Sequence, residues 1–183
     1  MQKIVLINGK KRAGKDYVAR ILQQELNKCG LTSCIESFAD PIKDIIATTL
    51  GLTLSELDNF KNKKSLIVIN GKEVCDARLM LQRFGTEAMK SWFGDDVWAK
   101  LLYENIKNIK ADVIIVPDFR FNVEKRKNTF TLKVVNDNVD KACDDNHQSE
   151  NELNDFKFDH VIDNTGYKDI TTGVNIVIKE MLL

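Results

Sequence analysis

The sequence predicts an α/β fold with a parallel, five-stranded sheet flanked by helices. Three observations favour this class. Short β-branched, apolar runs alternate along the chain with longer segments of helical periodicity. A glycine-containing basic turn joins the first such run to the first helical segment. The chain has 183 residues, 43% hydrophobic and 30% charged, which is enough for one domain with its own core.

The first elements are the clearest. Lys3–Asn8 (KIVLIN) is typical of a strand buried on both faces. Residues 16–28 then place Val18, Leu22 and Leu26 at helical spacing, and Gly30 after them is typical of a helix C-cap. Residues 33–38 predict a second strand.

The middle of the chain is predicted to be mainly helical. The expected helices cover residues 41–50, 54–64 (with a loop at the end), 77–89 and 95–108. Pro41 suits the first turn, where its missing N–H has no cost. Residues 65–74 predict a β-hairpin, because Asn70-Gly71 is a strong signal for a tight turn.

Residues 112–117 (DVIIVP) form the most apolar strand, which we expect at the centre of the sheet. The elements expected after it are a short polar helix at 123–127, strands at 131–136 and 160–163, and a helix at 170–183. Residues 137–159 are acidic and rich in Asn and Asp, which favours a loop.

Charge and composition exclude several functions. Lys plus Arg and Asp plus Glu both total 27, so no global basic field directs the chain to duplex nucleic acid or to an anionic membrane. No apolar run approaches the roughly 20 residues of a membrane span, and the first residues do not resemble a signal peptide. A Cys29–Cys34 disulfide would need an oxidising compartment, whereas free thiols suit the cytoplasm. We therefore expect a cytoplasmic protein, in a host cell if the gene is viral.

Residues 9–16 (GKKRAGKD) match the phosphate-binding pattern GxxxxGK, with Asp16 where Ser or Thr is usual. Gly9 and Gly14 allow the backbone to approach phosphate oxygens, and Lys15 supplies a charge for the β- and γ-phosphates. Asp16 would face Mg²⁺. The alternative, a chance match in a basic turn, is disfavoured because the motif follows a strand and opens a helix.

A second acidic group follows the apolar strand. Asp118 and Arg120 stand at its carboxyl end, where open α/β sheets bind ligands. We expect Asp118 to hold Mg²⁺ with Asp16, and Arg120 to clamp a phosphate. The alternatives are a helix N-cap for Asp118 and an ion pair between Arg120 and Glu124.

With these residues in view, the chain resembles the bacteriophage deoxynucleoside monophosphate kinases. Besides the loop, the matching segments are residues 38–43 (FADPIK), 78–87 (RLMLQRFGTE) followed by Trp98, 116–120 (VPDFR) with Glu124, and 160–166 (HVIDNTG). The resemblance implies one P-loop kinase domain over residues 1–183. Its core would be about 1–38, 111–136 and 159–183, with a helical monophosphate-binding insertion at about 39–110 and a short lid at about 137–158.

The resemblance also implies the reaction, in which the ATP γ-phosphate moves to a deoxynucleoside 5′-monophosphate with Mg²⁺ as cofactor. ATP would contact Arg12, Ala13, Gly14, Lys15, Asp16 and Tyr17. The monophosphate would contact Lys11, Lys43, Arg78, Gly85, Thr86, Trp98, Asp118, Arg120 and Glu124. The catalytic groups would be Lys15, Arg120, Asp118 and Arg12, and the metal ligands Asp16 and Asp118.

Some of these roles have structural alternatives. Trp98 has apolar neighbours and suits a core position as well as a base platform, and Lys43 and Arg78 suit solvated helix surfaces. The expected lid contains no arginine, so Arg12 and Arg120 would stabilise the transition state. His147 is a further candidate, with an exposed loop position as its alternative.

Two other functions stay open. Animal phosphomevalonate kinases have a similar GKRxxGKD loop and a similar acidic segment, so another small-molecule kinase is one alternative. A nucleotide-binding regulator without an acceptor is the other. The cations Lys43, Arg78 and Arg120 exceed what one ATP needs and favour a second anionic ligand. We expect ATP and a monophosphate as partners and leave a homodimer open.

Overall fold

The computed structural model describes residues 2–63, 65–140, 152–166 and 169–183. The chain divides into two compact units. Unit 1 consists of Met1–Ser37 and Glu104–Leu183, and unit 2 of Phe38–Tyr103. Unit 2 is therefore inserted into the sequence of unit 1.

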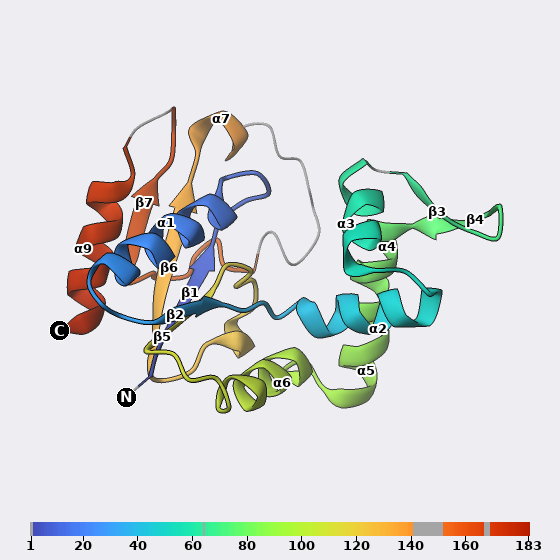
Figure 1. The fold of residues 1–183 in the computed structure, drawn as a ribbon, viewed down its shortest axis with the longest axis horizontal. Coiled ribbons are helices and arrows are strands. Elements are labelled where there is room, and N and C mark those ends of the chain that lie inside the picture. Colours follow the sequence, from blue (N-terminus) through green and yellow to red (C-terminus); the bar gives the residue numbers. More distant parts are fainter. Residues whose placement is uncertain (1, 64, 141–151, 167–168) are drawn as a thin grey trace. The chain divides into compact units, whose positions relative to one another are not determined.

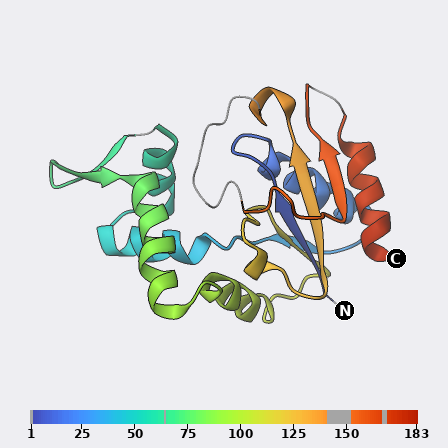
Figure 2. The same cartoon turned by 180° about the vertical axis from the view of Figure 1, so that it is seen from behind.

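Unit 1 contains the sheet (Figure 1). Its strands are β1 (Lys3–Asn8), β2 (Ser33–Ile35), β5 (Val113–Val116), β6 (Thr129–Val135) and β7 (His160–Asp163). They pair in the order β2-β5-β1-β6-β7, and every pairing is parallel. Figure 2 shows β1, β6 and β7 side by side from behind. The predicted fold class, a five-stranded parallel sheet flanked by helices, is confirmed.

The centre of the sheet differs from the prediction. β5 is buried along its whole length but lies second in the order, between β2 and β1. β1 occupies the middle position, because it pairs with β5 on one side and with β6 on the other. An apolar run therefore identified an internal strand correctly, but could not distinguish the middle strand from its neighbour.

Helices α1 (Lys15–Lys28) and α9 (Thr171–Leu182) pack on one face of the sheet. They share a core with alternate residues of the strands, among them Val5 and Ile7 of β1. The buried positions of α1 are Val18, Ala19, Leu22 and Leu26, an apolar stripe of helical spacing. Burying each of the larger side chains, Val18, Leu22 and Leu26, contributes about 1.5–3 kcal/mol.

The end of α1 is set by Gly30, as the sequence predicts. Gly30 has φ 77°, its N–H donates to the Asn27 carbonyl at 3.0 Å, and the Leu31 N–H donates to the Leu26 carbonyl at 3.0 Å. This pair of bonds is a Schellman motif, which requires a left-handed residue where glycine is most easily accommodated. The chain then turns directly into β2.

Several boundaries in unit 1 differ from the expectations. β2 ends at Ile35 rather than at residue 38, and the polar helix is a single 3₁₀ turn, η2 (Asn122–Glu124). The expected loop at 137–159 begins with a short helix, α7 (Asp137–Asp140). Residues 141–151 of that segment lie outside the described residues, and so do His147 and Cys143.

Unit 2 contains helices and one hairpin. Its elements are α2 (Asp40–Leu50), α3 (Leu54–Lys63), β3 (Leu66–Ile69), β4 (Lys72–Asp76), α4 (Ala77–Gln82), the π-helix η1 (Arg83–Ala88), α5 (Met89–Phe93) and the first part of α6 (Val97–Ile106). The hairpin is confirmed, and Asn70 and Gly71 both have positive φ, as a type I′ turn requires. The expected helix at 77–89 is instead divided by the π-helix, a change that 3.6-residue periodicity does not reveal.

The described cysteines Cys29, Cys34 and Cys75 are free, and burial raises the pKa of the Cys34 thiol to about 11. The second cause of this shift is the nearby Glu36 carboxylate. Among the described residues, no helix has the length and apolar character of a membrane span.

Two similar Thr–Asp pairs join parallel strands near their amino ends. The Asp112 carboxylate accepts from the N–H and hydroxyl of Thr32, at 2.8 and 2.7 Å. Asp159 accepts from the N–H and hydroxyl of Thr131 at the same distances. The Thr32 hydroxyl and N–H hold the pKa of Asp112 below its ordinary value. Asp112 therefore stabilises the fold fully at neutral pH, and this contribution is lost only as pH falls through the lowered pKa.

We predict that Thr131→Val lowers the free energy of unfolding by about 1–2 kcal/mol, because the fully buried Thr131 hydroxyl loses its bonds to Asp159. Thr32→Val should cost less, because water can replace the bonds of an exposed hydroxyl. Urea denaturation of both variants measures the difference. Equal losses would show that burial does not set the strength of these pairs.

Candidate active site

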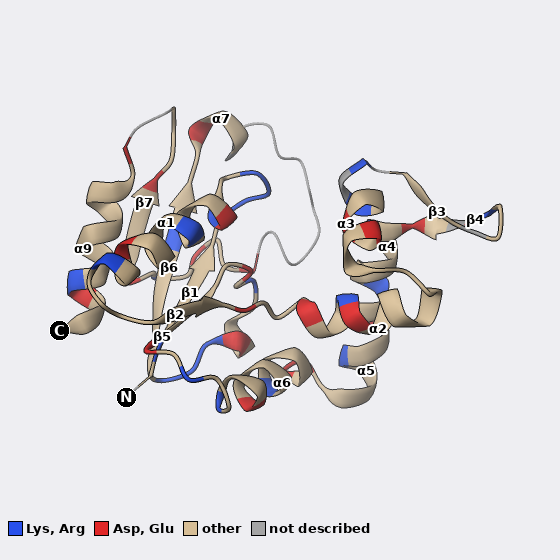
Figure 3. Cartoon of the chain, in the orientation of Figure 1, with Lys and Arg blue, Asp and Glu red and all other residues tan. Residues whose placement is uncertain are grey.

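The GKKRAGKD segment forms the loop between β1 and α1 and the start of α1, and the ribbon of this loop is blue in Figure 3 where its lysines and arginine lie. Arg12 and Gly14 have left-handed φ values of 67° and 95°, and the Ala13 N–H donates to the Lys10 carbonyl at 3.1 Å. Ala13 is fully buried, whereas the Arg12 side chain is exposed. This backbone, followed by a helix N-terminus, is the arrangement that binds phosphate groups.

The Lys15 side chain lies against the loop that precedes it. Its ammonium donates to the Gly9 and Lys10 carbonyl oxygens, at 2.7 and 3.0 Å. Lys15 opens α1, and the exposed Asp16 stands beside it in the first turn. The positive charge of Lys15 is thus held at the phosphate-binding loop. The side chain of Tyr17, which follows Asp16, is about half exposed.

Both glycines of the motif are required by close contacts. A Cβ at Gly9 would lie 2.5 Å from the Val134 carbonyl oxygen. A Cβ at Gly14 would lie 2.2 Å from Nδ2 of Asn164, and the φ of Gly14 also disfavours other residues. The loop is therefore in contact with Val134, which lies in β6, and with Asn164, which follows β7.

Asn164 supports the loop from the segment after β7, a role that the sequence analysis missed. Its amide Nδ2 donates to the Ala13 carbonyl at 2.8 Å, and its backbone N–H donates to the Val135 carbonyl at 2.8 Å. Asn164 belongs to residues 160–166 (HVIDNTG), which resemble a segment of the deoxynucleoside monophosphate kinases. The resemblance predicts no role for Asn164 itself. A side-chain contact across 151 positions leaves no local signal.

The segment after β5 is tied to the end of β1. The register pairs Leu6 with Val116, the last residue of β5, and β1 continues for two residues to Asn8. The Asn8 amide then donates to the Phe119 carbonyl at 2.8 Å, and the Phe119 N–H donates to the Ile7 carbonyl at 3.2 Å. Asp118 and Arg120 flank Phe119. This geometry brings the acidic segment next to the phosphate-binding loop.

Asp118 has a partner that the sequence analysis did not identify. The Ser37 hydroxyl, two residues after β2, donates to its Oδ2 atom at 2.7 Å. Asp118 does not cap a helix, because η2 begins at Asn122 with Phe121 as its N-cap residue. This hydrogen bond fixes the orientation of the Asp118 carboxylate, which is half-buried.

Glu124 stabilises the backbone beside Arg120. Its buried carboxylate accepts from the Arg120 N–H at 2.7 Å and from the Phe121 N–H at 3.0 Å. This explains the four-residue spacing between Arg120 and Glu124. A direct contact of Glu124 with an acceptor stays a prediction.

Asp16 and Asp118 offer carboxylate oxygens, the ligands that Mg²⁺ prefers. No group of three or more His, Cys, Asp or Glu side chains suited to a metal occurs among the described residues. Mg²⁺ in nucleotide sites usually takes one or two carboxylates and completes its shell with water and phosphate oxygens. The donor chemistry of the two residues fits such a site.

The other expected acceptor residues belong to unit 2: Lys43, Arg78, Gly85, Thr86 and Trp98. Trp98 is only 5% exposed, and its indole N–H donates to the Gly85 carbonyl at 2.8 Å. This supports the core alternative for Trp98.

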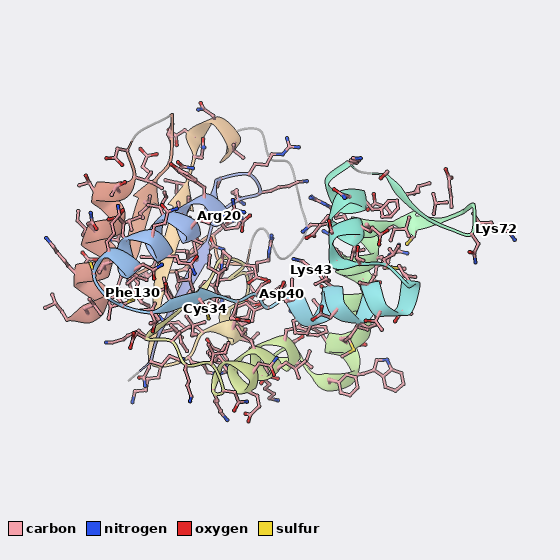
Figure 4. All side chains as sticks on the ribbon, viewed as in Figure 1. Arg20, Cys34, Asp40, Lys43, Lys72 and Phe130 are labelled. Atoms are coloured by element: carbon pink, nitrogen blue, oxygen red, sulfur yellow. The ribbon has the colours of Figure 1, made fainter. Side chains whose placement is uncertain are left out.

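Gly85 lies in the π-helix with Thr86, and a Cβ there would come within 2.9 Å of the Ile42 side chain. Lys43 lies beside Asp40 on α2, 3.3 Å from its carboxylate (Figure 4). Arg78 is half-buried in α4. Lys11, in unit 1, is half-buried in the phosphate-binding loop.

The loop, the parallel sheet and the charged groups at its carboxyl edge define a P-loop kinase fold. A family model described as phosphomevalonate kinase matches residues 7–133, which is more than half of the chain. The chain belongs to the phosphomevalonate kinase family.

Individual relatives agree with this family. The phosphomevalonate kinase of Drosophila melanogaster is 47% identical over 57 residues, which are 31% of this chain and 29% of that protein. The match therefore spans less than a third of the relative. It supports the phosphomevalonate kinase alternative, and the finer resemblance to deoxynucleoside monophosphate kinases is not supported.

The chain also has similarity to solved structures, among them an APS kinase of Mycobacterium tuberculosis and an uncharacterized protein from Eubacterium ventriosum. The APS kinase has 15% identity and a TM-score of 0.45, with 99% of this chain and 96% of the other covered. The second structure has 15% identity and a TM-score of 0.48, with 99% and 98% covered.

We predict that Gly14→Ala weakens the binding of an ATP analogue about tenfold or more, because its Cβ would displace Asn164 and strain the loop. Gly30→Ala is the matched control, since Gly30 also has positive φ but has no atom within 4 Å of the added Cβ. Gly30→Ala should cost about 1 kcal/mol of stability and leave binding unchanged. Calorimetric titration compares the two, and equal binding would contradict the close contact with Asn164.

Proposed function

We propose that this protein is an ATP-dependent kinase that transfers the γ-phosphoryl group of ATP to the phosphate of phosphomevalonate. The family match over residues 7–133 carries the choice of acceptor. The phosphate-binding loop and the adjacent Asp118–Arg120 segment support the reaction type.

The transfer forms a bond between an acceptor phosphate oxygen and the γ-phosphorus, and breaks the bond between that phosphorus and the β–γ bridging oxygen. ADP leaves with the electron pair. The acceptor oxygen is already ionised at neutral pH, so no general base is needed. Catalysis then consists of positioning and of charge stabilisation, to which Lys15, Arg12 and Arg120 would contribute.

Asp118 suits a role in binding the metal or orienting the phosphates rather than in proton transfer, because its carboxylate accepts a hydrogen bond from the Ser37 hydroxyl. Asp16 would share this role from the first turn of α1. When bound there, Mg²⁺ supplies positive charge that neutralises the β- and γ-phosphates.

The acceptor carries a phosphate and a carboxylate but no base. Lys11, Lys43, Arg78 and Arg120 are the cations proposed for these two anionic groups. An acceptor without a base needs no exposed aromatic face, and this agrees with the burial of Trp98. The same cations favour a second anionic ligand and therefore disfavour a regulator that binds only one nucleotide.

We expect ADP release in a coupled assay with ATP and Mg²⁺ to rise about tenfold or more over background when phosphomevalonate is added. Mevalonate, which lacks the acceptor phosphate, is the matched control and should leave the rate at background. If deoxynucleoside monophosphates raised ADP release and phosphomevalonate did not, phosphomevalonate would be ruled out as the acceptor. ATP turnover that responds to no acceptor would indicate the regulator.

Lys15→Ala and Arg120→Ala should each lower kcat by about 10²–10⁴-fold, because both remove charge stabilisation of the transferred group. The Tm should change by only a few degrees, since neither side chain belongs to the apolar core. Arg20→Ala is the control, because Arg20 lies exposed on α1 (Figure 4). Turnover near that of wild type in either site variant would refute the site.

A further inference from the structure

Three phenylalanines of unit 1 form a cluster of edge-to-face contacts. The Phe119 and Phe156 rings lie 5.5 Å apart at 81°, and the Phe119 and Phe158 rings lie 6.3 Å apart at 77°. Phe156 and Phe158 lie 4.7 Å apart at 62°. Edge-to-face contacts of this kind fix both the distance and the orientation of rings. The proposed site does not explain this cluster.

Phe119 stands between the two charged residues of the site. Its ring is fully buried, whereas Asp118 and Arg120 are half-buried. The segment lies beyond the end of β5, so no strand ladder orients it. Its backbone is held by the bonds of Phe119 to Ile7 and Asn8. The backbone at Phe119 therefore carries both of these charged neighbours.

Residues 152–158 contribute Phe156 and Phe158 to the cluster. The Glu152 carboxylate accepts from the Asn122 N–H at 2.9 Å, and Leu153 is only 4% exposed. The ammonium of Lys125 lies 5.1 Å from the centre of the Phe156 ring. The segment is thus anchored on both sides of η2.

The far end of the segment is held as well. The ammonium of Lys133, on β6, lies 5.5 Å from the centre of the Phe158 ring. Asp159, the next residue, is bonded to Thr131. These contacts all lie within unit 1, where they join a segment from the last third of the chain to the Asp118–Arg120 segment.

We propose that Phe156 and Phe158 are positioning residues that hold Phe119 and thereby orient Asp118 and Arg120 for phosphoryl transfer. The proposal rests on the proposed function and adds to it a determinant outside the residues proposed to bind ATP and the acceptor. Small displacements of groups around a transferred phosphoryl reduce the rate strongly, because catalysis depends on alignment. If Phe156 and Phe158 served only to pack the core, substituting them would change only the stability of the fold.

The test compares three variants of the full chain. Phe156→Leu removes the aromatic edge, Phe156→Tyr keeps the ring at a half-buried position, and Phe130→Leu changes a half-buried phenylalanine of β6 that packs on the main core (Figure 4). For each variant, kcat and the KM for ATP are measured with phosphomevalonate, together with the Tm and with amide hydrogen exchange at Phe119 and Arg120.

Phe156→Leu should lower kcat about tenfold to a hundredfold with the KM for ATP changed less than about twofold. Phe156→Tyr should restore kcat, and Phe130→Leu should lower the Tm with kcat unchanged. The Phe119 and Arg120 amides should exchange faster only in Phe156→Leu. Equal kcat in Phe156→Leu and Phe130→Leu would overturn the proposal.

The two proposals fail in different ways. If wild-type protein does not phosphorylate phosphomevalonate, the proposed function fails, and hydrogen exchange then decides the positioning role. Faster exchange at Phe119 and Arg120 in Phe156→Leu, absent from Phe156→Tyr and Phe130→Leu, supports the cluster. Unchanged amide exchange at Phe119 and Arg120 in Phe156→Leu would show that the aromatic cluster does not hold the Asp118–Arg120 segment.

Discussion

The pairing of β1 with β5 is the constraint on which the site depends. These strands are parallel and in register, with Leu6 opposite Val116, so the loop that leaves β1 and the segment that leaves β5 start from the same edge of the sheet. The Asn8 amide then joins them by its bond to the Phe119 carbonyl. A phosphate-binding loop and a carboxylate can be placed together on many folds, but here one strand pairing supplies both.

Residues around this edge act mainly as supports. Ser37 orients Asp118, Glu124 binds the backbone of Arg120, and Asn164 holds the carbonyl of Ala13. Each support comes from a different segment, so the charged groups are fixed by polar contacts from around the edge of the sheet. Groups that must stabilise a short-lived charge distribution benefit from such prior fixing, because little reorganisation is then needed during the reaction.

The sequence predicted those parts of the molecule that have local patterns. β-branched runs identified the strands, Asn70-Gly71 the hairpin, and the glycine spacing the phosphate-binding loop. Ser37 and Asn164 could not be predicted, because their partners lie 81 and 151 positions away. Periodicity could not reveal the π-helix at residues 83–88 either. The loop alone does not identify the acceptor, since related kinases share it, and the proposed acceptor therefore rests on the family match.

The insertion of unit 2 between β2 and β5 has a consequence for folding kinetics. The bond between Thr32 and Asp112 closes a separation of 80 positions, and β1 must find β5 across a longer stretch. Such non-local pairings slow folding, because the entropy of loop closure is lost before the contacts form. Unit 2 has a core of its own, so its early collapse would shorten the effective loop and bring the two strands within reach. Substitutions in that core are therefore expected to slow the folding of the whole chain, including the distant sheet.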